Sequence, residues 1–380
     1  MKNASKVAAL SLGIVLLYLL AWPVPIAPVS WDAPVDRGLV DPFEINSLLQ
    51  PAYPIDLGDF EGPEDATIGI DGKVYVTTLS GHIVQLDNGR VRPFAFPGGR
   101  PLGIEAKSDG SFVVANAFTG LQHIDRRGGV TSLLSEVDGQ PLVYANNLAV
   151  GPDGTIYFSE SSRKFGAESS QGTYEASLLD IMEHGGHGRV FAFDPGTGRA
   201  DVLLDKLNFA NGVAVSGDGS FLLISETGHY RVLKHWLSGE RKGSTEVLIE
   251  NLPGFPDNLK SGLQGRFWLG LAAPRNALLD KISDRPLMRK VVQRLPQFLR
   301  PKPVPSSHVI AFNGDGEVLM NLHDPDTRFP MLTGVVETRR SLYLTTLFGN
   351  SLPRIDKRYL YTQRSLNHEP GPAPGTSLRL

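Results

Sequence analysis

The sequence contains no cysteine, which excludes disulfide bonds, thiolate metal ligands and a cysteine nucleophile. It also lacks a strong excess of either charge, because 37 basic and 40 acidic residues leave a formal net charge of −3. Without a basic stripe, nucleic acid is not an expected partner. The Gly-x-Ser-x-Gly motif of a nucleophile elbow is missing too, which argues against covalent acyl-enzyme chemistry. A small molecule is the expected partner.

One long apolar run stands at the N-terminus, where Lys2 and Lys6 precede uncharged residues 7–22. Such a segment is either a signal peptide or a short membrane anchor. No small-x-small cleavage site follows it, and Tyr18 and Trp22 stand where an interfacial belt would lie, which favours an uncleaved anchor over residues 1–30. Residues 31–44 are then a linker. The positive-inside tendency places the remaining chain in a periplasmic or extracellular/lumenal compartment; cleavage of the anchor would make it secreted.

The rest of the chain is periodic: a polar cluster, a short strand, a tight turn and a second strand recur six times. The six instances begin at residues 62–72 (GPEDATIGIDG), 101–110 (PLGIEAKSDG), 145–154 (ANNLAVGPDG), 209–219 (FANGVAVSGDG), 256–265 (PDNLKSGLQG) and 332–341 (LTGVVETRRS). Apolar and β-branched runs flank each turn, as in hairpins of buried strands.

Units of roughly 40 residues with four short strands each are typical of propeller blades. We therefore predict an all-β fold, a six-bladed β-propeller with a central metal channel over residues 45–361, followed by a flexible tail over 362–380. Two units carry extra residues with helical spacing of apolar side chains, 173–184 and 276–298. These insertions are expected to lie over one mouth of the propeller, although plain surface decoration is the alternative.

A single position in each unit carries the candidate chemistry. Counting seven residues back from the turn gives Glu64, Leu102, Asn146, Asn211, Asp257 and Thr333. Because the first strand of every blade lines the central channel, these positions converge on the axis. Carboxylates and amides together supply the oxygen ligands that Ca²⁺ prefers.

The sequence thus predicts a calcium site with ligands from four blades. A single Asn before Gly is more often a turn signal than a ligand, so the prediction rests on the shared register rather than on Asn211 alone. The next position holds Asp65, Asn147 and Asn258 in three blades. We expect alternative or supporting ligands there, and Asn258 in particular is expected to touch the ion. The sequence leaves open whether Asn146 or Asn147 is the ligand from the third blade.

Several segments resemble the strictosidine synthase-like family, within the larger group that contains paraoxonases and gluconolactonases, and most of all its adipocyte plasma membrane-associated type. They are residues 188–195 (GRVFAFDP), 209–216 (FANGVAVS), 224–227 (ISET), 230–239 (YRVLKHWLSG), 252–258 (LPGFPDN) and 267–275 (FWLGLAAPR). The resemblance is dense over residues 140–275. It implies a six-bladed propeller, a central Ca²⁺ held by the four oxygen-bearing positions, and cleavage of lactones or aryl esters in the hydrolytic members.

Two residues depart from the family pattern. The catalytic glutamate of the alkaloid-forming members corresponds to Thr333, so the resemblance does not support a strictosidine-type condensation. The histidine that helps to activate water in paraoxonases corresponds to Leu102, which puts a paraoxonase-like rate in doubt.

The remaining hypothesis is a calcium-dependent hydrolase of a small ester or lactone, in which the metal polarises the carbonyl and Asp257 assists the attacking water. His184 and His187 end the first insertion and are further candidates at the channel mouth. The alternative is a membrane-anchored binding or scaffold propeller whose Ca²⁺ only ties the blades together. A sugar-lactone enzyme would need a polar pocket, whereas Phe209, Phe255, Phe329 and Met331 suggest an apolar one.

Overall fold

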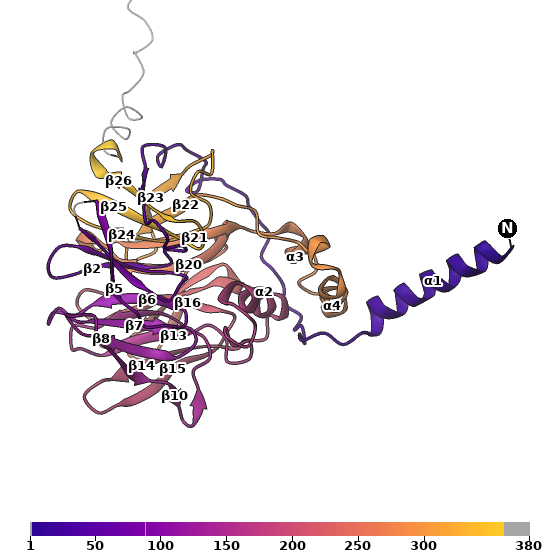
Figure 1. Ribbon diagram of the computed structural model, residues 1–380, viewed down its shortest axis with the longest axis horizontal. Helices are drawn as coiled ribbons and strands as arrows, with labels where there is room; N and C mark the ends of the chain where they lie inside the picture. The colour runs from indigo at the N-terminus through magenta and orange to yellow at the C-terminus, as the bar shows by residue number, and fades with distance from the viewer. Residues whose placement is uncertain (1, 88, 361–380) are drawn as a thin grey trace, which may run out of the picture.

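The computed structural model describes residues 2–87 and 89–360, and the tail predicted at 362–380 lies outside them. Six four-stranded antiparallel sheets make up the body (Figure 1). Their first strands, β2, β6, β12, β16, β20 and β24, contact one another in that order and β24 returns to β2, which closes a ring. The prediction of an all-β, six-bladed β-propeller is confirmed.

Five blades run from an inner to an outer strand in chain order, and the sixth takes its outer strand from the N-terminal side of the chain. The first three blades are β2 (Ala66–Ile68), β3 (Val74–Thr77), β4 (Ile83–Asp87) and β5 (Arg90–Ala95); β6 (Pro101–Ala106), β7 (Phe112–Asn116), β8 (Gly120–Ile124) and β9 (Val130–Leu134); and β12 (Ala145–Val150), β13 (Ile156–Glu160), β14 (Gly188–Asp194) and β15 (Arg199–Leu207). A small hairpin of β10 (Glu136–Val137) and β11 (Gln140–Pro141) links the second blade to the third.

The other three blades are β16 (Ala210–Val215), β17 (Phe221–Glu226), β18 (Arg231–Trp236) and β19 (Thr245–Ile249); β20 (Gly254–Ser261), β21 (Phe267–Pro274), β22 (His308–Phe312) and β23 (Val318–His323); and β24 (Leu332–Glu337), β25 (Ser341–Thr346), β26 (Ser351–Asp356) and β1 (Tyr53–Asp56). Strand β1 precedes the first blade in sequence but pairs with β26, with Tyr53 opposite Arg354. The N-terminal side of the chain therefore closes the ring.

In the Asp-Gly turns the aspartate side chain accepts hydrogen bonds from the turn and the glycine has a positive φ. In the fourth blade Asp218 Oδ1 accepts hydrogen bonds from the backbone N–H and the hydroxyl of Ser220, while Gly219 has a φ of 70°, a conformation that favours glycine. The same device, with Asp153 and Gly154, turns the third blade. These turns all lie at the end of the first strand, so they share one face of the propeller.

The opposite face carries the helices. Helix α2 (Thr173–Glu183) lies between β13 and β14, and α3 (Ala277–Lys281), α4 (Pro286–Arg294) and η3 (Gln297–Leu299) lie between β21 and β22. Asn276 caps α3 by accepting from the backbone N–H groups of Leu278 and Leu279, and Pro286 occupies the first turn of α4. The single turn η1 (Thr227–His229) follows β17 on this face, whereas the single turn η2 (Leu263–Gly265) lies between β20 and β21 on the other face.

The segment predicted as a linker, 31–44, lies along the body. Trp31 stacks on His184 with a ring-centroid distance of 4.0 Å, and its backbone N–H donates to the carbonyl of Ser283. The buried guanidinium of Arg289 donates to the carbonyls of Val29, Ser283 and Met182. One arginine thus joins the N-terminal segment to both helical insertions.

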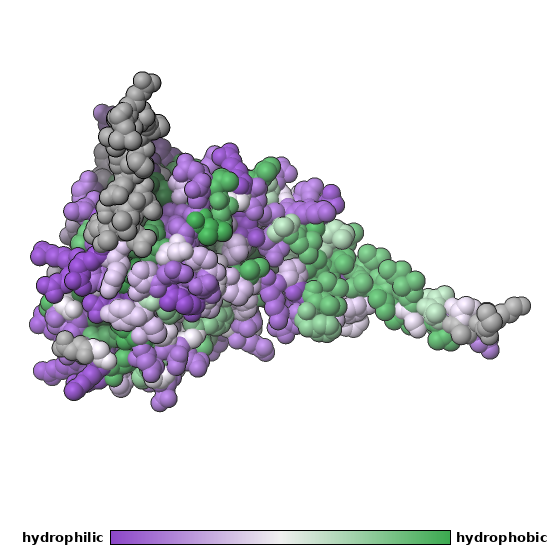
Figure 2. All heavy atoms as spheres, turned by 90° about the horizontal axis from the view of Figure 1, so that it is seen from above, coloured by the Kyte–Doolittle hydropathy of each residue, from purple (hydrophilic) through white to green (hydrophobic). Residues whose placement is uncertain are grey.

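Helix α1 (Lys2–Ala21) projects away from the propeller, on the side that carries α2 and α4 (Figure 1). Its side chains are largely exposed and apolar (Figure 2). Among the residues that the structure describes, no helix combines the length and apolarity needed to cross a membrane.

Candidate metal and substrate site

The first strand of most blades is irregular at the position that the sequence singles out. Pairing between the first and second strands shifts between Ala145 and Leu148 in the third blade and between Ala210 and Val213 in the fourth. Comparable shifts occur in the second, fifth and sixth blades. Such bulges bend the strand and re-aim its side chains. They place the candidate residues at the helix-bearing end of the channel.

Four of the predicted ligands meet at the floor of one cavity. Glu64, Asn146, Asn211 and Asp257 all line it, and each is at most 6% exposed. They come from the first, third, fourth and fifth blades, so the fold brings together residues separated by up to 193 positions, 64 to 257. Leu102 of the second blade lines the same cavity.

The two asparagine amides are held in one orientation. Asn146 Nδ2 donates to Ser161 Oγ at 2.8 Å, and Asn211 Nδ2 donates to Thr227 Oγ1 at 3.2 Å. Both carbonyl oxygens are buried and have no hydrogen-bond donor among the described residues. A buried carbonyl without a donor is costly unless a cation or water satisfies it. Both oxygens are therefore available to a ligand.

The carboxylates of Glu64 and Asp257 are both buried and repel each other when both are ionised. Burial raises the pKa of Glu64 from 4.5 to about 7, with Arg100 lowering it and Asp65 raising it further. Burial, and after it the charge of Glu64, also holds the pKa of Asp257 well above its usual range. Two buried acids whose charges repel each other favour either protonation or a bound cation.

This donor set fits a hard cation. Two carboxylates and two amide carbonyls provide four oxygen ligands, and Ca²⁺ takes such mixtures and fills its remaining positions with water or substrate. The described part of the chain holds no cluster of three or more histidine, aspartate or glutamate side chains that could bind a metal ion, and this set has only two carboxylates, so the two amide oxygens are essential to it. The residues that would hold Ca²⁺ are Glu64, Asn146, Asn211 and Asp257.

The neighbouring positions brace the strands instead of lining the cavity. Asn258 Nδ2 donates to Glu64 O at 3.0 Å, and its Oδ1 accepts from Asn147 Nδ2 at 3.1 Å. Asn147 Oδ1 in turn accepts from the backbone N–H of Val213 at 3.0 Å. Thr333 Oγ1 donates to the carbonyl of Glu64 at 2.7 Å. Both ends of the Asn258 amide are thus occupied. Its Nδ2 also lies 3.3 Å from Glu64 Oε1, so Asn258 supports Glu64 but does not itself line the cavity.

A buried ammonium occupies the channel below this layer. Lys260 Nζ lies 2.9 Å from Asp65 Oδ2 and 2.8 Å from Glu105 Oε1, and donates to the carbonyl of Ile104 at 2.7 Å. Burial lowers the pKa of Lys260, but the attraction of Asp65 and Glu105 outweighs it and the net shift is upward. Lys260 neutralises the acids of the deeper layer.

Lys260→Met is expected to destabilise the propeller by about 3–5 kcal/mol, because it leaves two acids, one of them fully buried, without their cation. Denaturant unfolding measures the change. The double variant Lys260→Met/Asp65→Asn should recover a large part of the loss. Equal stability of the double and single variants would show that the ion pair with Asp65 does not hold the channel together.

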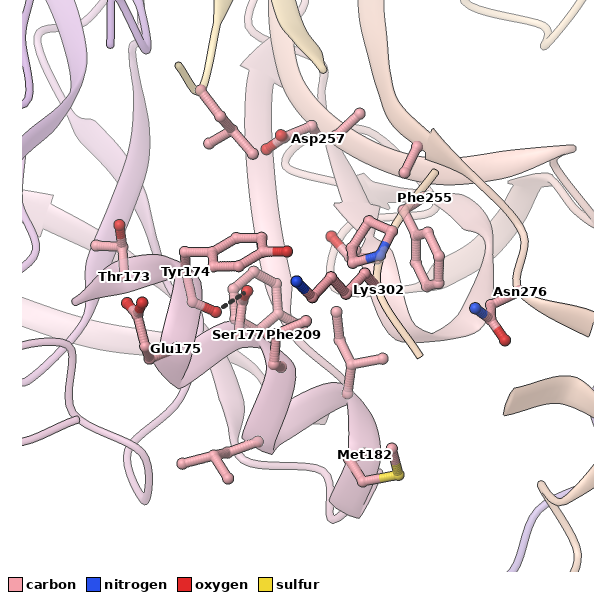
Figure 3. Close-up of a pocket in the computed structure, with 18 of the residues that line it drawn as sticks. Thr173, Tyr174, Glu175, Ser177, Met182, Phe209, Phe255, Asp257, Asn276 and Lys302 are labelled. Carbon is pink, nitrogen blue, oxygen red and sulfur yellow. Dashed lines mark hydrogen bonds between the residues drawn. The ribbon is translucent and has the colours of Figure 1, made fainter. Parts of the chain in front are cut away.

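The cavity above the floor has a volume of about 500 Å³ and mainly apolar walls. Figure 3 shows Asp257 and Phe255 on one side, and Tyr174, Phe209 and Met182 on the other. Phe209 and Met331 line it as predicted, whereas Phe329 packs in the hydrophobic core between the fifth and sixth blades. The ammonium end of Lys302, from the segment after η3, points across the cavity towards Tyr174 (Figure 3).

His184 and His187 are placed beside α2, outside the residues that line the cavity. His184 is buried, and its Nε2 lies 3.2 Å from Nε2 of His229; burial lowers the pKa of His184 from 6.5 to about 2. His187 Nε2 lies 2.6 Å from Glu183 Oε1. Both histidines thus have partners away from the cavity.

Sequence reasoning missed a belt of hydroxyl groups on the second strands. These side chains donate to backbone carbonyls of the first strand in the next blade: Thr77 to Leu102 at 2.7 Å, Ser159 to Asn211 at 2.5 Å, Ser161 to Ala210 at 2.8 Å, Ser225 to Asp257 at 2.6 Å and Thr227 to Pro256 at 2.7 Å. The recurrence of Ser or Thr near the end of the second strand in the first, third, fourth and sixth blades was the available signal. Tyr144, which lines the cavity and donates to the carbonyl of Thr173, was also missed.

The chain is similar in sequence to proteins of one known family. The family profile described as strictosidine synthase matches residues 146–240, and the strictosidine synthase-like N-terminal profile matches residues 41–86. The adipocyte plasma membrane-associated protein of Bos taurus is 34% identical over 335 residues, which cover 82% of this chain and 79% of that protein. The chain belongs to the strictosidine synthase-like family. The human adipocyte plasma membrane-associated protein is 33% identical to this strictosidine synthase-like chain, over 84% of it and 80% of the human protein.

Solved structures agree with the fold of this strictosidine synthase-like propeller. A gluconolactonase from Xanthomonas campestris superposes with a TM-score of 0.59 at 17% identity, covering 87% of this chain and 98% of that one. The calcium-binding protein regucalcin from Agrobacterium tumefaciens gives a TM-score of 0.56 at 15% identity, covering 80% and 92%. At this identity the similarity shows the fold alone.

Proposed function

We propose that this strictosidine synthase-like protein is a Ca²⁺-dependent hydrolase of lactones or aryl esters. The observation that carries the proposal is the buried floor of Glu64, Asn146, Asn211 and Asp257, with two amide oxygens that lack donors among the described residues. When bound there, Ca²⁺ would polarise an ester carbonyl and stabilise the charge that develops on its oxygen. One protein of the same fold is named a gluconolactonase and another a calcium-binding protein, and both names support this proposal.

The side chains of this chain divide the remaining work. An Oδ atom of Asp257, which lines the cavity floor, takes a proton from the attacking water. Phe209, Phe255 and Met331 bind the apolar part of the ester and exclude bulk water from the floor. Asn146 and Asn211 orient their carbonyl oxygens through Ser161 and Thr227.

The apolar walls favour aryl esters and alkyl-substituted lactones over sugar lactones, whose hydroxyl groups would lack partners there. We expect the kcat/KM of phenyl acetate and of an alkyl-substituted δ-lactone to exceed that of gluconolactone by at least about tenfold, since one buried unpaired hydroxyl costs about 1–3 kcal/mol. Initial rates with the full-length chain, after EDTA and after Ca²⁺ refill, measure this. A preference for gluconolactone would indicate the sugar-lactone function, and calcium-independent rates would contradict the proposal.

One observation favours a second candidate, a propeller that binds a small molecule without converting it. Leu102 stands where paraoxonases have a histidine, and the hydroxyl of Thr333 is engaged with Glu64 O and Thr345 Oγ1. Under this alternative Ca²⁺ raises the melting temperature but no ester is hydrolysed. The same assay with EDTA and refill distinguishes the two.

We further propose that α1 attaches the protein to a membrane, with the propeller outside the cytoplasm. Its exposed apolar side chains support this, among them Leu10, Ile14 and Leu17, and the relatives are named as plasma membrane-associated. Fractionation of the full chain against a variant lacking residues 2–21 tests it. Recovery of both chains in the soluble fraction would contradict the assignment.

A further inference from the structure

Four large apolar side chains are exposed at the mouth of the cavity. Leu287 and Met288 of α4 are 56% and 44% exposed, and Phe298 and Leu299 of η3 are 78% and 56% exposed. We refer to these four residues as the α4 rim. Phe298 and Leu299 lie between Gln297 and Arg300, which line the cavity. Phe298 and Leu299 therefore lie at the edge of the cavity entrance, and Leu287 and Met288 extend the exposed apolar surface along α4.

The charge around the rim has one dominant sign. Residues 277–305 contain seven basic and two acidic residues, and five of the basic ones reach the surface because Arg289 and Arg294 are buried. Both acids have cationic partners, Asp280 with Arg275 and Asp284 with Arg285. Lys290 of α4 and Lys302 beside the rim add positive charge next to exposed apolar side chains. Large apolar groups flanked by lysine and arginine are the composition of an interfacial membrane-binding surface.

The rim is continuous with α1. Arg294, the last residue of α4, donates through Nε to the carbonyl of Trp22 at 2.5 Å and through Nη1 to that of Leu19 at 2.9 Å. The hydroxyl of Tyr18 donates to the carbonyl of Arg294 at 3.0 Å. The last turn of α1 is thus fixed to the end of α4, and Figure 2 shows apolar side chains continuing from the body onto α1.

We propose that the α4 rim docks on the surface of a lipid bilayer that carries anionic headgroups. Leu287, Met288, Phe298 and Leu299 enter the interface between headgroups and acyl chains, while Lys290 contacts the headgroups. The cavity entrance then opens at the membrane surface. Its substrates are lipophilic esters or lactones that partition into the bilayer; this second statement rests on the proposed function, whereas the docking itself does not.

The absence of cysteine gives a direct test. Phe298→Cys in the full-length chain, labelled with an environment-sensitive fluorophore, is mixed with vesicles of phosphatidylcholine and phosphatidylglycerol. The matched control is Ile70→Cys, an exposed apolar position 64% accessible in the turn between β2 and β3, on the opposite face. We expect a blue shift and quenching by lipid-borne quencher at position 298 and none at position 70, with less quenching on pure phosphatidylcholine.

Equal behaviour of the two labels would overturn the proposal, because α1 alone would then hold the protein. A blue shift at position 298 without vesicles that grows with protein concentration would also overturn it, in favour of a second copy as the partner. The variant Leu287→Ser/Phe298→Ser/Leu299→Ser should abolish the vesicle-dependent quenching of a label at Met288→Cys. Persistent quenching in that variant would contradict a role for the rim.

Hydrolysis separates this inference from the proposed function. The triple serine variant should hydrolyse soluble phenyl acetate at the wild-type rate but lose at least severalfold in rate on a long-chain ester presented in vesicles. Equal losses on both esters would show a folding defect and contradict the membrane-supply step. If neither protein hydrolyses any ester, the proposed function fails, while the fluorescence result still decides whether the rim docks.

Discussion

Asp257→Asn is expected to abolish calcium-dependent hydrolysis, with kcat/KM lower by about 10²–10⁴-fold, the usual contribution of a general base. The substitution also removes one of two formal charges from the proposed cation site. Two unit charges about 4 Å apart at an effective dielectric constant of about 20 attract by about 4 kcal/mol. Since about 1.4 kcal/mol is a tenfold change in affinity, calcium binding should weaken by at least about 100-fold.

The sign of the stability change makes this result specific. Burial and the charge of Glu64 hold the pKa of Asp257 above its usual range, so a neutral side chain should not lower the melting temperature of the calcium-free protein. Calcium should raise the melting temperature of the wild type and leave that of Asp257→Asn unchanged. Glu105→Gln, which removes a carboxylate bound to Lys260 on the same axis, should retain the calcium response. If Asp257→Asn and Glu105→Gln both lose the calcium-induced rise in melting temperature, or if both keep it, the assignment of Asp257 is contradicted.

Gly212→Ala is expected to destabilise the fold strongly. Gly212 follows Asn211 in β16, and a Cβ there would lie 2.1 Å from Leu259 N and 2.6 Å from Asp257 O, both backbone atoms of β20 in the next blade. Backbone cannot move aside without separating the inner strands. We expect a loss of about 3 kcal/mol and a fall of about 5 °C in melting temperature for a domain of this size.

The matched control is Gly217→Ala in the turn after the same strand, where a Cβ would meet nothing within 4 Å. Scanning calorimetry of both variants checks the prediction. Because Gly212 lies between Asn211 and the blade that carries Asp257, the Gly212 variant should also bind calcium more weakly. Equal melting temperatures for the two variants would show that β16 and β20 can move apart to accommodate a methyl group at little cost.

The repeat made much of the fold predictable. The tight turns recur at a fixed place in each unit, and alternating strands surround them, so both the number of blades and the inner strands follow from the sequence. The same register identified Glu64, Asn146, Asn211 and Asp257, because strands that converge on one axis bring equal positions together. No local motif would have linked residues so far apart in the chain.

Other features depend on contacts between blades, which cannot be read from the position of a residue within its repeat. Asn146 and Asn147 are adjacent and identical, and only the partners in other blades separate them: Ser161 orients the first towards the cavity, whereas Asn258 and Val213 engage the second. The occupied amide of Asn258 and the closure by β1 likewise arise from long-range pairing. The extension of the cavity by the segment around Lys302 could not be predicted, since that segment has no periodicity.

The central claim is that the inner strands of four blades form one calcium site. Calorimetric titration of CaCl₂ into the EDTA-treated full-length protein tests it most directly, with Asn211→Leu as the variant, because leucine keeps the approximate volume of asparagine but removes the carbonyl oxygen. We predict one ion per chain for the wild type and strongly weakened binding for Asn211→Leu. The same affinity in both proteins, or no binding to the wild type, would contradict the calcium site and the hydrolytic function that depends on it.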